Sequence, residues 1–359
     1  MGSTDPTELD DPFGHGSLTD VPGVRFGHHH RIGSGWQTGT TVVLCPNGAT
    51  AAVDVRGGGP GTRETDALAP ENLVDRIHAI CLTGGSAYGL AAADGVMAEL
   101  ERRRLGVRVG PEPHQVVPVV PTAVIFDLGR GGRFDHRPGA DFGHRAIRRA
   151  TGRSPSPGRG AVGAGAGAVA GGLQGGVGTA SVRVEMEHSV VTVGALAVVN
   201  SAGSPIDPAT GLPWTPAAHL VRPQRTERSR VAELVGTRGR LPLNTTIGVV
   251  ATDARLDRAR TSRLAMAAHD GLARAIRPAH GLTDGDTVFA VSTAPASPVA
   301  TVDRADLVVA DLDRLSAAAA VVFERACLDA ILNAVTIGTA PAYRDLCPSA
   351  FRRTARSGR

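Results

Sequence analysis

Short apolar runs rich in β-branched residues, bounded by glycine or proline, recur along the chain and predict β-strands. These runs cover residues 40–44, 51–55, 77–83, 116–127, 179–185, 189–200, 244–251 and 287–293. Apolar side chains at helical spacing predict helices over residues 90–103, about 262–276 and 315–335. Strands and helices do not alternate regularly and no repeat of 20–50 residues is present, so the pattern predicts one layered α/β domain.

Four segments show neither the apolar runs typical of strands nor the apolar spacing typical of helices. Residues 1–17 are predicted to be a flexible tail, which leaves a single domain over residues 18–359. Residues 129–159 and 222–243 are rich in arginine, glycine or proline and are predicted to be loops. Residues 160–178 are almost all glycine and alanine, which suits places where one backbone comes close to another backbone or to a ligand.

Composition narrows the class of protein. Hydrophobic residues make up 42% of the 359 residues and charged residues 20%, which allows a large core and excludes global disorder. No apolar run is long enough to span a membrane, and the polar start does not resemble a signal peptide. Four cysteines without CxxC spacing suggest buried or free thiols in a reducing cytoplasm.

The net charge of +4 raises the possibility of nucleic-acid binding, but the basic residues are dispersed. Aromatic residues make up only 3% of the chain, so the side chains that stack on bases are nearly absent, and no nucleic-acid partner is expected. All 38 basic residues are arginine, and the sequence contains no lysine.

Cofactor and metal motifs are absent from the sequence. The glycines at 57–61 and 160–178 lack the strand–GxGxxG–helix context of a dinucleotide site, so tight turns or close packing are favoured. The histidines at 28–30 and the pair Asp141/His144 show no HExxH or paired Cys/His spacing and are expected to be solvated or capping residues. Neither a cofactor nor a metal is therefore expected.

The sequence Asn244-Thr245-Thr246 stands between a long polar segment and an apolar strand. Such a context suits a self-cleaving precursor, because the new N-terminus must be held rigidly while the released end is free to leave. A threonine hydroxyl needs a base to accept its proton, and a freed α-amine can serve, since its pKa is about 7.7–8.0 against about 10.4 for lysine.

Eight segments resemble, in order, the DmpA-type L-aminopeptidase/D-esterase family, which includes β-peptidyl aminopeptidases and nylon-oligomer (6-aminohexanoate oligomer) hydrolases. They are LTDVPGVRFGH (18–28), AVDVRGGGPGTRETD (52–66), LTGGSAYGLAAADGVM (82–97), VVPVVPTAVIFDL (116–128), GGVGTAS (175–181), NTTIGVVATDA (244–254), AAHDGLARAIRPAH (267–280) and DGDTVFAVST (284–293). The resemblance implies an αββα sandwich shared with ornithine acetyltransferases. It also implies a precursor that cuts itself once and an oligomer of the processed units.

By this resemblance the cut falls between Asn244 and Thr245, giving an α chain of residues 1–244 and a β chain of residues 245–359. Thr245 becomes the N-terminal nucleophile of an enzyme that hydrolyses amide bonds of small peptides, β-peptides or nylon-type oligomers. Homo-tetramers or larger assemblies of αβ units are expected. An acyltransferase of the ornithine acetyltransferase type, or a catalytically weakened binding or scaffold relative, stays open as an alternative.

The resemblance assigns further site residues. Asp284 and Asp286 match the downstream pair that orients the nucleophile and its amine, Asn200 matches the asparagine near the oxyanion, and Tyr88 matches a tyrosine of the substrate pocket. A polar turn, a strand-end turn and core packing are the respective structural alternatives for these positions. Some relatives carry a lysine near the glycine-rich run, where this chain has Gly172 and Gln174; Gln174 can donate a hydrogen bond but supplies no positive charge.

Overall fold

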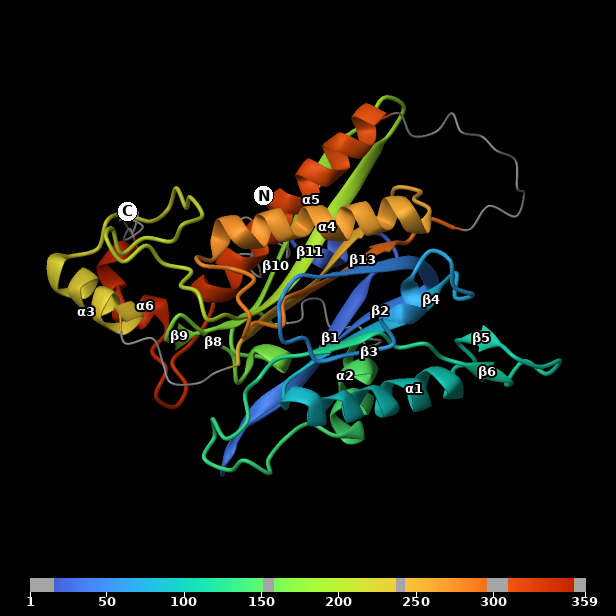
Figure 1. The fold of residues 1–359 in the computed structure, drawn as a ribbon, viewed down its shortest axis with the longest axis horizontal. Helices are drawn as coiled ribbons and strands as arrows, with labels where there is room; N and C mark the ends of the chain where they lie inside the picture. The colour runs from blue at the N-terminus through green and yellow to red at the C-terminus, as the bar shows by residue number, and fades with distance from the viewer. Residues whose placement is uncertain (1–15, 151–157, 237–242, 296–308, 352–359) are drawn as a thin grey trace, which may run out of the picture.

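A mixed β-sheet forms the frame of the computed structural model (Figure 1), and one long strand takes part in both of its layers. The structure describes residues 16–150, 158–236, 243–295 and 309–351. Within these residues the sheet order is β10-β11-β12-β13-β2-β4-β7-β3, and β1 pairs with β2. The strands are β1 (Arg25–Gly33), β2 (Trp36–Val55), β3 (Thr62–Arg63), β4 (Ile77–Thr83), β7 (Thr122–Val124), β10 (Gly176–Glu185), β11 (Val190–Asn200), β12 (Thr245–Thr252) and β13 (Thr287–Ser292). Two small hairpins lie outside it, namely β5 (Val107–Arg108) with β6 (Val116–Val117) and β8 (Val169–Ala170) with β9 (Leu173–Gln174).

Strand β2 belongs to both halves of the sheet. Its first part, through Leu44, pairs with β1 and β4, whereas residues 50–55 pair with β13. Its register with β4 shifts between Leu44 and Ala49, where Pro46 cannot donate to the ladder and Gly48 has φ +74°. The two strands predicted over residues 40–44 and 51–55 are therefore one irregular strand of 20 residues.

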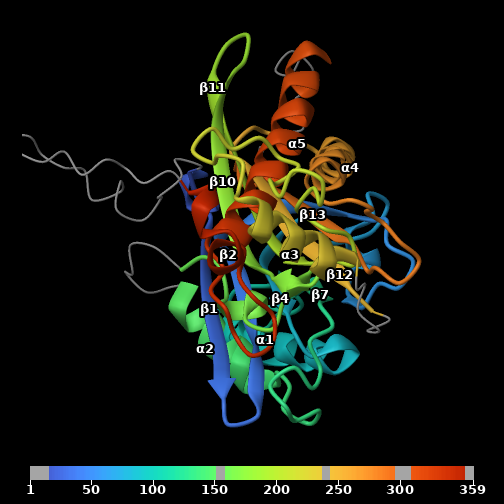
Figure 2. The same ribbon diagram turned by 90° about the vertical axis from the view of Figure 1, so that its left-hand side faces the viewer.

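The helices cover the two outer faces, as Figure 1 shows: α4 and α5 lie on one side of the sheets, and α1 and α2 on the other. The helices are α1 (Ala92–Arg102), α2 (Ala140–Ala150), α3 (Arg225–Gly236), α4 (Arg258–Ala275), α5 (Val309–Leu332) and α6 (Tyr343–Leu346). Short 3₁₀ turns are η2 (Leu18–Asp20), η3 (Asp66–Leu68), η4 (Ser86–Ala91), η5 (Gly163–Gly165) and η6 (Pro348–Ala350). Figure 2 shows the β1–β2 and β10–β11 hairpins extending in opposite directions.

Three hydrophobic clusters fill the spaces between four layers. Along β11 and β12, alternate side chains face opposite ways, so Val250 packs under α4 and α5, whereas Ile247 and Val249 face the other half of the sheet. A third cluster packs β2 and β4 against α1 and α2. The order helix, sheet, sheet, helix is the αββα arrangement that the resemblance implied.

Two segments predicted to be loops contain helices. Residues 140–150 form α2, whose buried stripe is Phe142, Ala146 and Ile147, and residues 225–236 form α3. In α2, Asp141 lies in the first turn and Arg148 and Arg149 in the last, which complements the helix dipole. The prediction was wrong because the arginine and glycine content of these segments obscured a short apolar stripe.

Glycines allow the helices to approach very closely. A Cβ on Gly143 of α2 would lie 1.9 Å from the carbonyl oxygen of Ala92, and one on Gly271 of α4 would lie 2.0 Å from that of Ala320. The distance between the two helices of each outer layer therefore depends on glycine at the crossing point.

All four cysteines are buried and free. Burial raises the pKa of the Cys45 and Cys81 thiols to about 12, so both stay protonated and unreactive. Among the described residues no helix is long and apolar enough to cross a bilayer. Of the predicted tail, residues 1–15 lie outside the described residues, and Ser17 caps η2.

Candidate active site

Thr245 is the first residue of β12, a strand that lies between antiparallel β11 and parallel β13 near the middle of the molecule. Only 5% of Thr245 is exposed. Its neighbour Asn244 forms a parallel bridge with Asp284, so the predicted cleavage site lies beside the Asp284–Asp286 segment.

Asn244, the residue before the predicted cut, is held by backbone hydrogen bonds at both its amide and its carbonyl. The Asn244 amide donates to the Thr283 carbonyl over 3.1 Å, and the Gly285 amide donates to the Asn244 carbonyl over 3.0 Å. The Thr245 hydroxyl donates to the same Asn244 carbonyl. An N–H donor directed at a carbonyl oxygen polarises the bond and stabilises negative charge developing there.

The two aspartates bind the backbone around this bond. Asp286 accepts the Thr246 amide over 2.7 Å with one oxygen and binds the amide and Nδ1 of His280 with the other. Asp284 accepts the amides of Gly281 (3.0 Å) and Ala202 (3.3 Å). Burial and the nearby charge of Asp286 raise the pKa of Asp284 above its usual value.

Asn200 ends β11 and is the direct cross-strand partner of Thr245. Its side chain is buried, its Oδ1 accepts the Val169 amide over 3.0 Å, and its Nδ2 donates to the Phe126 carbonyl over 3.4 Å. The antiparallel register thus brings together two residues 45 positions apart in the sequence.

The other two predicted binding residues, Tyr88 and Gln174, do not line the cavity described below, although Gln174 pairs with Val169, which does. Tyr88, in η4, is 54% exposed, and the Arg137 guanidinium stacks 3.7 Å from its ring centroid. Gln174 is fully buried in β9 and donates to the Ala168 carbonyl over 2.9 Å. Thr245, Asn200, Asp284 and Asp286 do not line this cavity either; they are joined to one another by one strand pair and one loop, and Asn244 is the residue of the predicted cleavage site that lines it.

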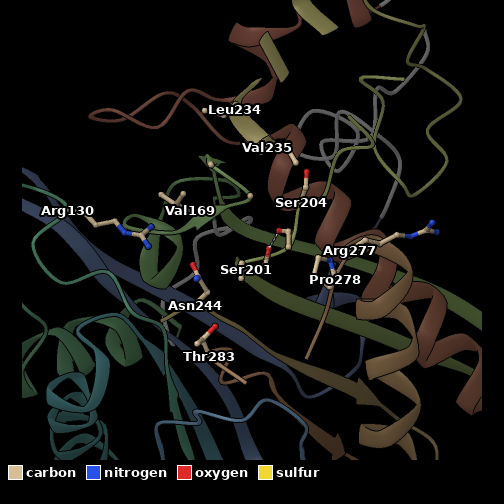
Figure 3. Close-up of a pocket in the computed structure, with 14 residues that line it drawn as sticks. Arg130, Val169, Ser201, Ser204, Leu234, Val235, Asn244, Arg277, Pro278 and Thr283 are labelled. Atoms are coloured by element: carbon tan, nitrogen blue, oxygen red, sulfur yellow. Dashed lines mark hydrogen bonds between the residues drawn. The ribbon is translucent and has the colours of Figure 1, made fainter. Parts of the chain in front are cut away.

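A cavity of about 290 Å³ opens beside Asn244 (Figure 3). Most of its described lining comes from four regions: the β8–β9 hairpin, the loop after β11, the end of α3 and the turn around Arg277 and Pro278; Arg130, Asn244 and Thr283 complete it. These residues are Arg130, Val169, Gly171, Gly172, Ser201, Ala202, Gly203, Ser204, Leu234, Val235, Asn244, Arg277, Pro278 and Thr283. The size suits a small organic group.

Sequence reasoning missed three residues at this site. Gly285 supplies the amide that reaches the Asn244 carbonyl, His280 binds Asp286, and Arg130 lines the cavity. Gly285 and His280 lie within the segments that carry the family resemblance, whereas Arg130 follows one of them by two residues, in a stretch that offered no periodic pattern.

The histidines at 28–30 were expected to be solvated or capping residues, but His28 and His29 are buried. The ring of His28 binds Thr41 and the Gly158 carbonyl, and burial lowers the pKa of His28 to about 3. Among the described residues no group of three or more His, Cys, Asp or Glu side chains is placed to hold a metal ion.

Comparisons with known proteins identify the family and agree with the fold. The model of peptidase family S58 matches residues 16–343. An uncharacterized aminopeptidase of Mycobacterium tuberculosis is 50% identical over 93% of this chain and 99% of its own length. A 6-aminohexanoate-oligomer endohydrolase of Kocuria sp. is 33% identical over 76% of this chain and 74% of its own length.

Solved structures show the same architecture. The L-aminopeptidase D-Ala-esterase/amidase of Ochrobactrum anthropi, described as a new variant of the Ntn hydrolase fold, superimposes with a TM-score of 0.69. The match covers 93% of this chain and 90% of that one at 22% identity, so it supports the fold alone. The layered α/β prediction and the family resemblance are confirmed. The chain belongs to peptidase family S58 and is a hydrolase that acts on amide bonds.

Proposed function

We propose that the protein is a self-processing amidohydrolase whose mature nucleophile is the N-terminal hydroxyl of Thr245. The observation that carries this proposal is the hydrogen-bonding of the Asn244 carbonyl, which accepts both the Gly285 amide and the Thr245 hydroxyl. Nucleophile, target carbonyl and oxyanion donor are therefore adjacent in the uncleaved chain.

Self-cleavage would begin with attack of the Thr245 oxygen on the Asn244 carbonyl carbon, and the Gly285 amide would stabilise the oxyanion. Breaking the C–N bond transfers the acyl group from nitrogen to oxygen and leaves an ester. Water then hydrolyses this ester, which gives a carboxylate on Asn244 and a free α-amine on Thr245.

The freed amine would act as the base in turnover. It accepts the hydroxyl proton of Thr245 while the oxygen attacks the substrate carbonyl, and it returns the proton to the departing amine. Water then hydrolyses the acyl-enzyme. Asp286 supports this geometry because it fixes the Thr246 amide, and Asn200 supports it as the cross-strand neighbour of the nucleophile.

Short peptides, β-peptides and nylon-type amide oligomers are the proposed substrates, in keeping with the names of the relatives. The cavity volume of about 290 Å³ supports small acyl groups.

The test is the mass of the purified protein over time, with the first residues of any small fragment read by N-terminal sequencing. Wild type should give fragments of about 25 and about 12 kDa, in proportion to 244 of 359 residues, and the small one should begin Thr-Thr-Ile. Thr245→Ala should stay one chain of 36.8 kDa and hydrolyse no amide. A wild-type chain that never splits, or a Thr245→Ala chain that splits at the same place, contradicts the proposal.

We further infer that processed αβ units assemble into tetramers or larger oligomers, as the family resemblance suggests. We also infer a cytoplasmic location, which the free, buried cysteines support. Sedimentation of the cleaved protein should give a mass near four times 36.8 kDa or above. A mass near 36.8 kDa would show a single αβ unit instead.

A further inference from the structure

Asp286 fixes the backbone beside the nucleophile, and its own orientation depends on His280. One carboxylate oxygen of Asp286 accepts the Thr246 amide over 2.7 Å. The other oxygen accepts the backbone amide of His280 over 3.0 Å and the ring Nδ1 of His280 over 2.9 Å. Only 2% of Asp286 is exposed, so these donors replace the water that an exposed carboxylate would bind.

The contact with Asp286 also sets the tautomer of His280. A carboxylate oxygen only accepts, so Nδ1 carries the proton and donates it to Asp286. The other ring nitrogen, Nε2, is buried and has no hydrogen-bond partner within the described part of the chain. The bond to Asp286 is therefore the hydrogen bond that orients the ring.

A second histidine, His269 of α4, packs against the ring of His280. The two ring centroids lie 4.9 Å apart in an edge-to-face arrangement. His269 is fully buried, and its Nε2 donates to the Asp54 carbonyl over 3.0 Å, which fixes its ring. Burial lowers the pKa of His269 to about 4, so at neutral pH it adds no positive charge beside His280.

The backbone of His280 is consistent with a dedicated role. Its φ is +58°, in the left-handed region that is uncommon for residues other than glycine. In this conformation the amide and the ring nitrogen of one residue reach the same oxygen of Asp286. Glycine would adopt this φ without strain but has no ring to donate, so the observed strain points to a use for the side chain.

We propose that His280 is a positioning residue for the nucleophile, which it orients through Asp286 and the Thr246 amide. The inference rests on the proposed function, because the hydroxyl and amine of Thr245 form a catalytic pair only after cleavage. The described lining of the cavity beside Asn244 does not include His280. His280 should therefore affect the alignment of the reacting groups and not the binding of substrate.

The first experiment compares His280→Gly with His280→Asn. Glycine removes the ring and suits the left-handed φ, so a loss of activity in this variant does not come from backbone strain. Asparagine also suits this φ, and its Nδ2 is bonded to Cγ, as Nδ1 of histidine is, so it can donate to Asp286. His280→Gly should lower the rate of self-cleavage and kcat by about 10- to 100-fold and change KM by less than about threefold. His280→Asn should recover most of the loss.

The value of kcat is counted per mole of small fragment, so that slow processing is not mistaken for slow turnover. His188→Gly is the matched control, because the His188 side chain is 78% exposed in the turn between β10 and β11, and both rates should stay at the wild-type value. Wild-type rates in His280→Gly, or a loss that His280→Asn does not recover, overturn the inference. A higher KM with kcat unchanged would assign His280 to substrate binding and overturn it as well.

A measurement on the uncleaved protein separates this inference from the proposed function. In Thr245→Ala, exchange of the Thr246 amide hydrogen, followed by NMR relative to the Val249 amide of the same strand, should be about tenfold faster or more with His280→Gly. His280→Asn should restore slow exchange. This result in a protein whose wild type neither splits nor hydrolyses amides would support the contact through Asp286 and overturn the proposed function. A wild type that splits and hydrolyses amides, with Thr246 exchange independent of His280, would overturn the inference alone.

Discussion

At the scale of single residues, the geometry around Thr245 depends on backbone groups as much as on side chains. The Asn244 carbonyl accepts the Gly285 amide, and Asp286 fixes the next amide along the strand. A Cβ on Gly285 would lie 2.9 Å from the Thr245 hydroxyl oxygen and 2.8 Å from the Gly59 carbonyl. Glycine at position 285 therefore leaves space for the Thr245 hydroxyl and also donates to the Asn244 carbonyl.

Gly285→Ala should slow self-cleavage by about 100-fold, because displacing reacting atoms by a fraction of an ångström to an ångström costs about that much. The measurement is the rate at which the 36.8 kDa chain disappears. Gly59→Ala is the control, since a Cβ there has no described neighbour closer than 3.7 Å. Unchanged cleavage in Gly285→Ala would show that the described contact does not position the nucleophile.

Asp127 gives a pH dependence of stability. Burial raises its pKa to about 6, so the folded protein holds a proton that the unfolded chain releases between about pH 4 and 6. The free energy of unfolding should therefore fall as pH rises through this window, with about 3 kcal/mol due to Asp127. Below both pKa values the carboxyl group is neutral in both states and has no such effect.

Asp127→Asn removes this titration. Urea unfolding of the Thr245→Ala precursor, with and without Asp127→Asn, gives the effect of the substitution at pH 4 and at pH 7. The change in the free energy of unfolding caused by Asp127→Asn should be about 3 kcal/mol more stabilising at pH 7 than at pH 4, because at pH 7 the substitution removes a buried charge. The same effect at both pH values would show that Asp127 keeps an ordinary pKa in the folded protein.

At the scale of elements, the β11–β12 register aligns neighbouring strands within one sheet, and the α4–α5 crossing sets the distance between two helices within one layer. The register places Asn200 opposite Thr245, and Gly271 of α4 lies against the Ala320 carbonyl of α5. In a free helix Gly→Ala would be stabilising by up to about 1 kcal/mol. At this crossing the new Cβ would lie 2.0 Å from a backbone oxygen, which cannot move without shifting α5.

Gly271→Ala should therefore destabilise the Thr245→Ala precursor by about 1–3 kcal/mol, since overpacking outweighs helix propensity. Asp270→Ala is the control, because the preceding side chain is 62% exposed and should change the free energy of unfolding by no more than about 0.5 kcal/mol. Both values come from urea unfolding, and a stabilising Gly271→Ala would contradict the close crossing.

The helices and strands also show which elements the apolar pattern of the sequence predicts correctly. Strands β4, β12 and β13 lie within one residue of the predicted limits, because each is a continuous apolar run with clear breakers. Helix α2 was missed although Phe142, Ala146 and Ile147 have helical spacing, since arginine and glycine dominate its composition. A stripe of three or four side chains is enough to bury one face of a short helix, and composition alone does not show it.

At the scale of the whole molecule, the absence of lysine gives a direct assay for processing. An uncleaved chain carries one aliphatic amine, at its N-terminus, and cleavage adds only the α-amine of Thr245. An amine-reactive reagent should therefore label the small fragment once, at Thr245, and should label Thr245→Ala only at the start of the uncut chain. Mass spectrometry locates the label, and a small fragment that is unlabelled or labelled elsewhere would exclude a free Thr245 amine.

The sequence by itself determined the family, the position of most strands along the chain and the candidates Thr245, Asn200, Asp284 and Asp286. Apolar runs and motifs are patterns of residues that are close in the sequence, so they can be recognised without the structure. Tertiary structure decided that β2 passes between two layers, that the Gly285 amide donates to the Asn244 carbonyl, and that Arg130 lines the cavity. These features depend on strand register and on contacts between segments far apart in the chain. The packing of the layers creates such contacts, and no local pattern encodes them.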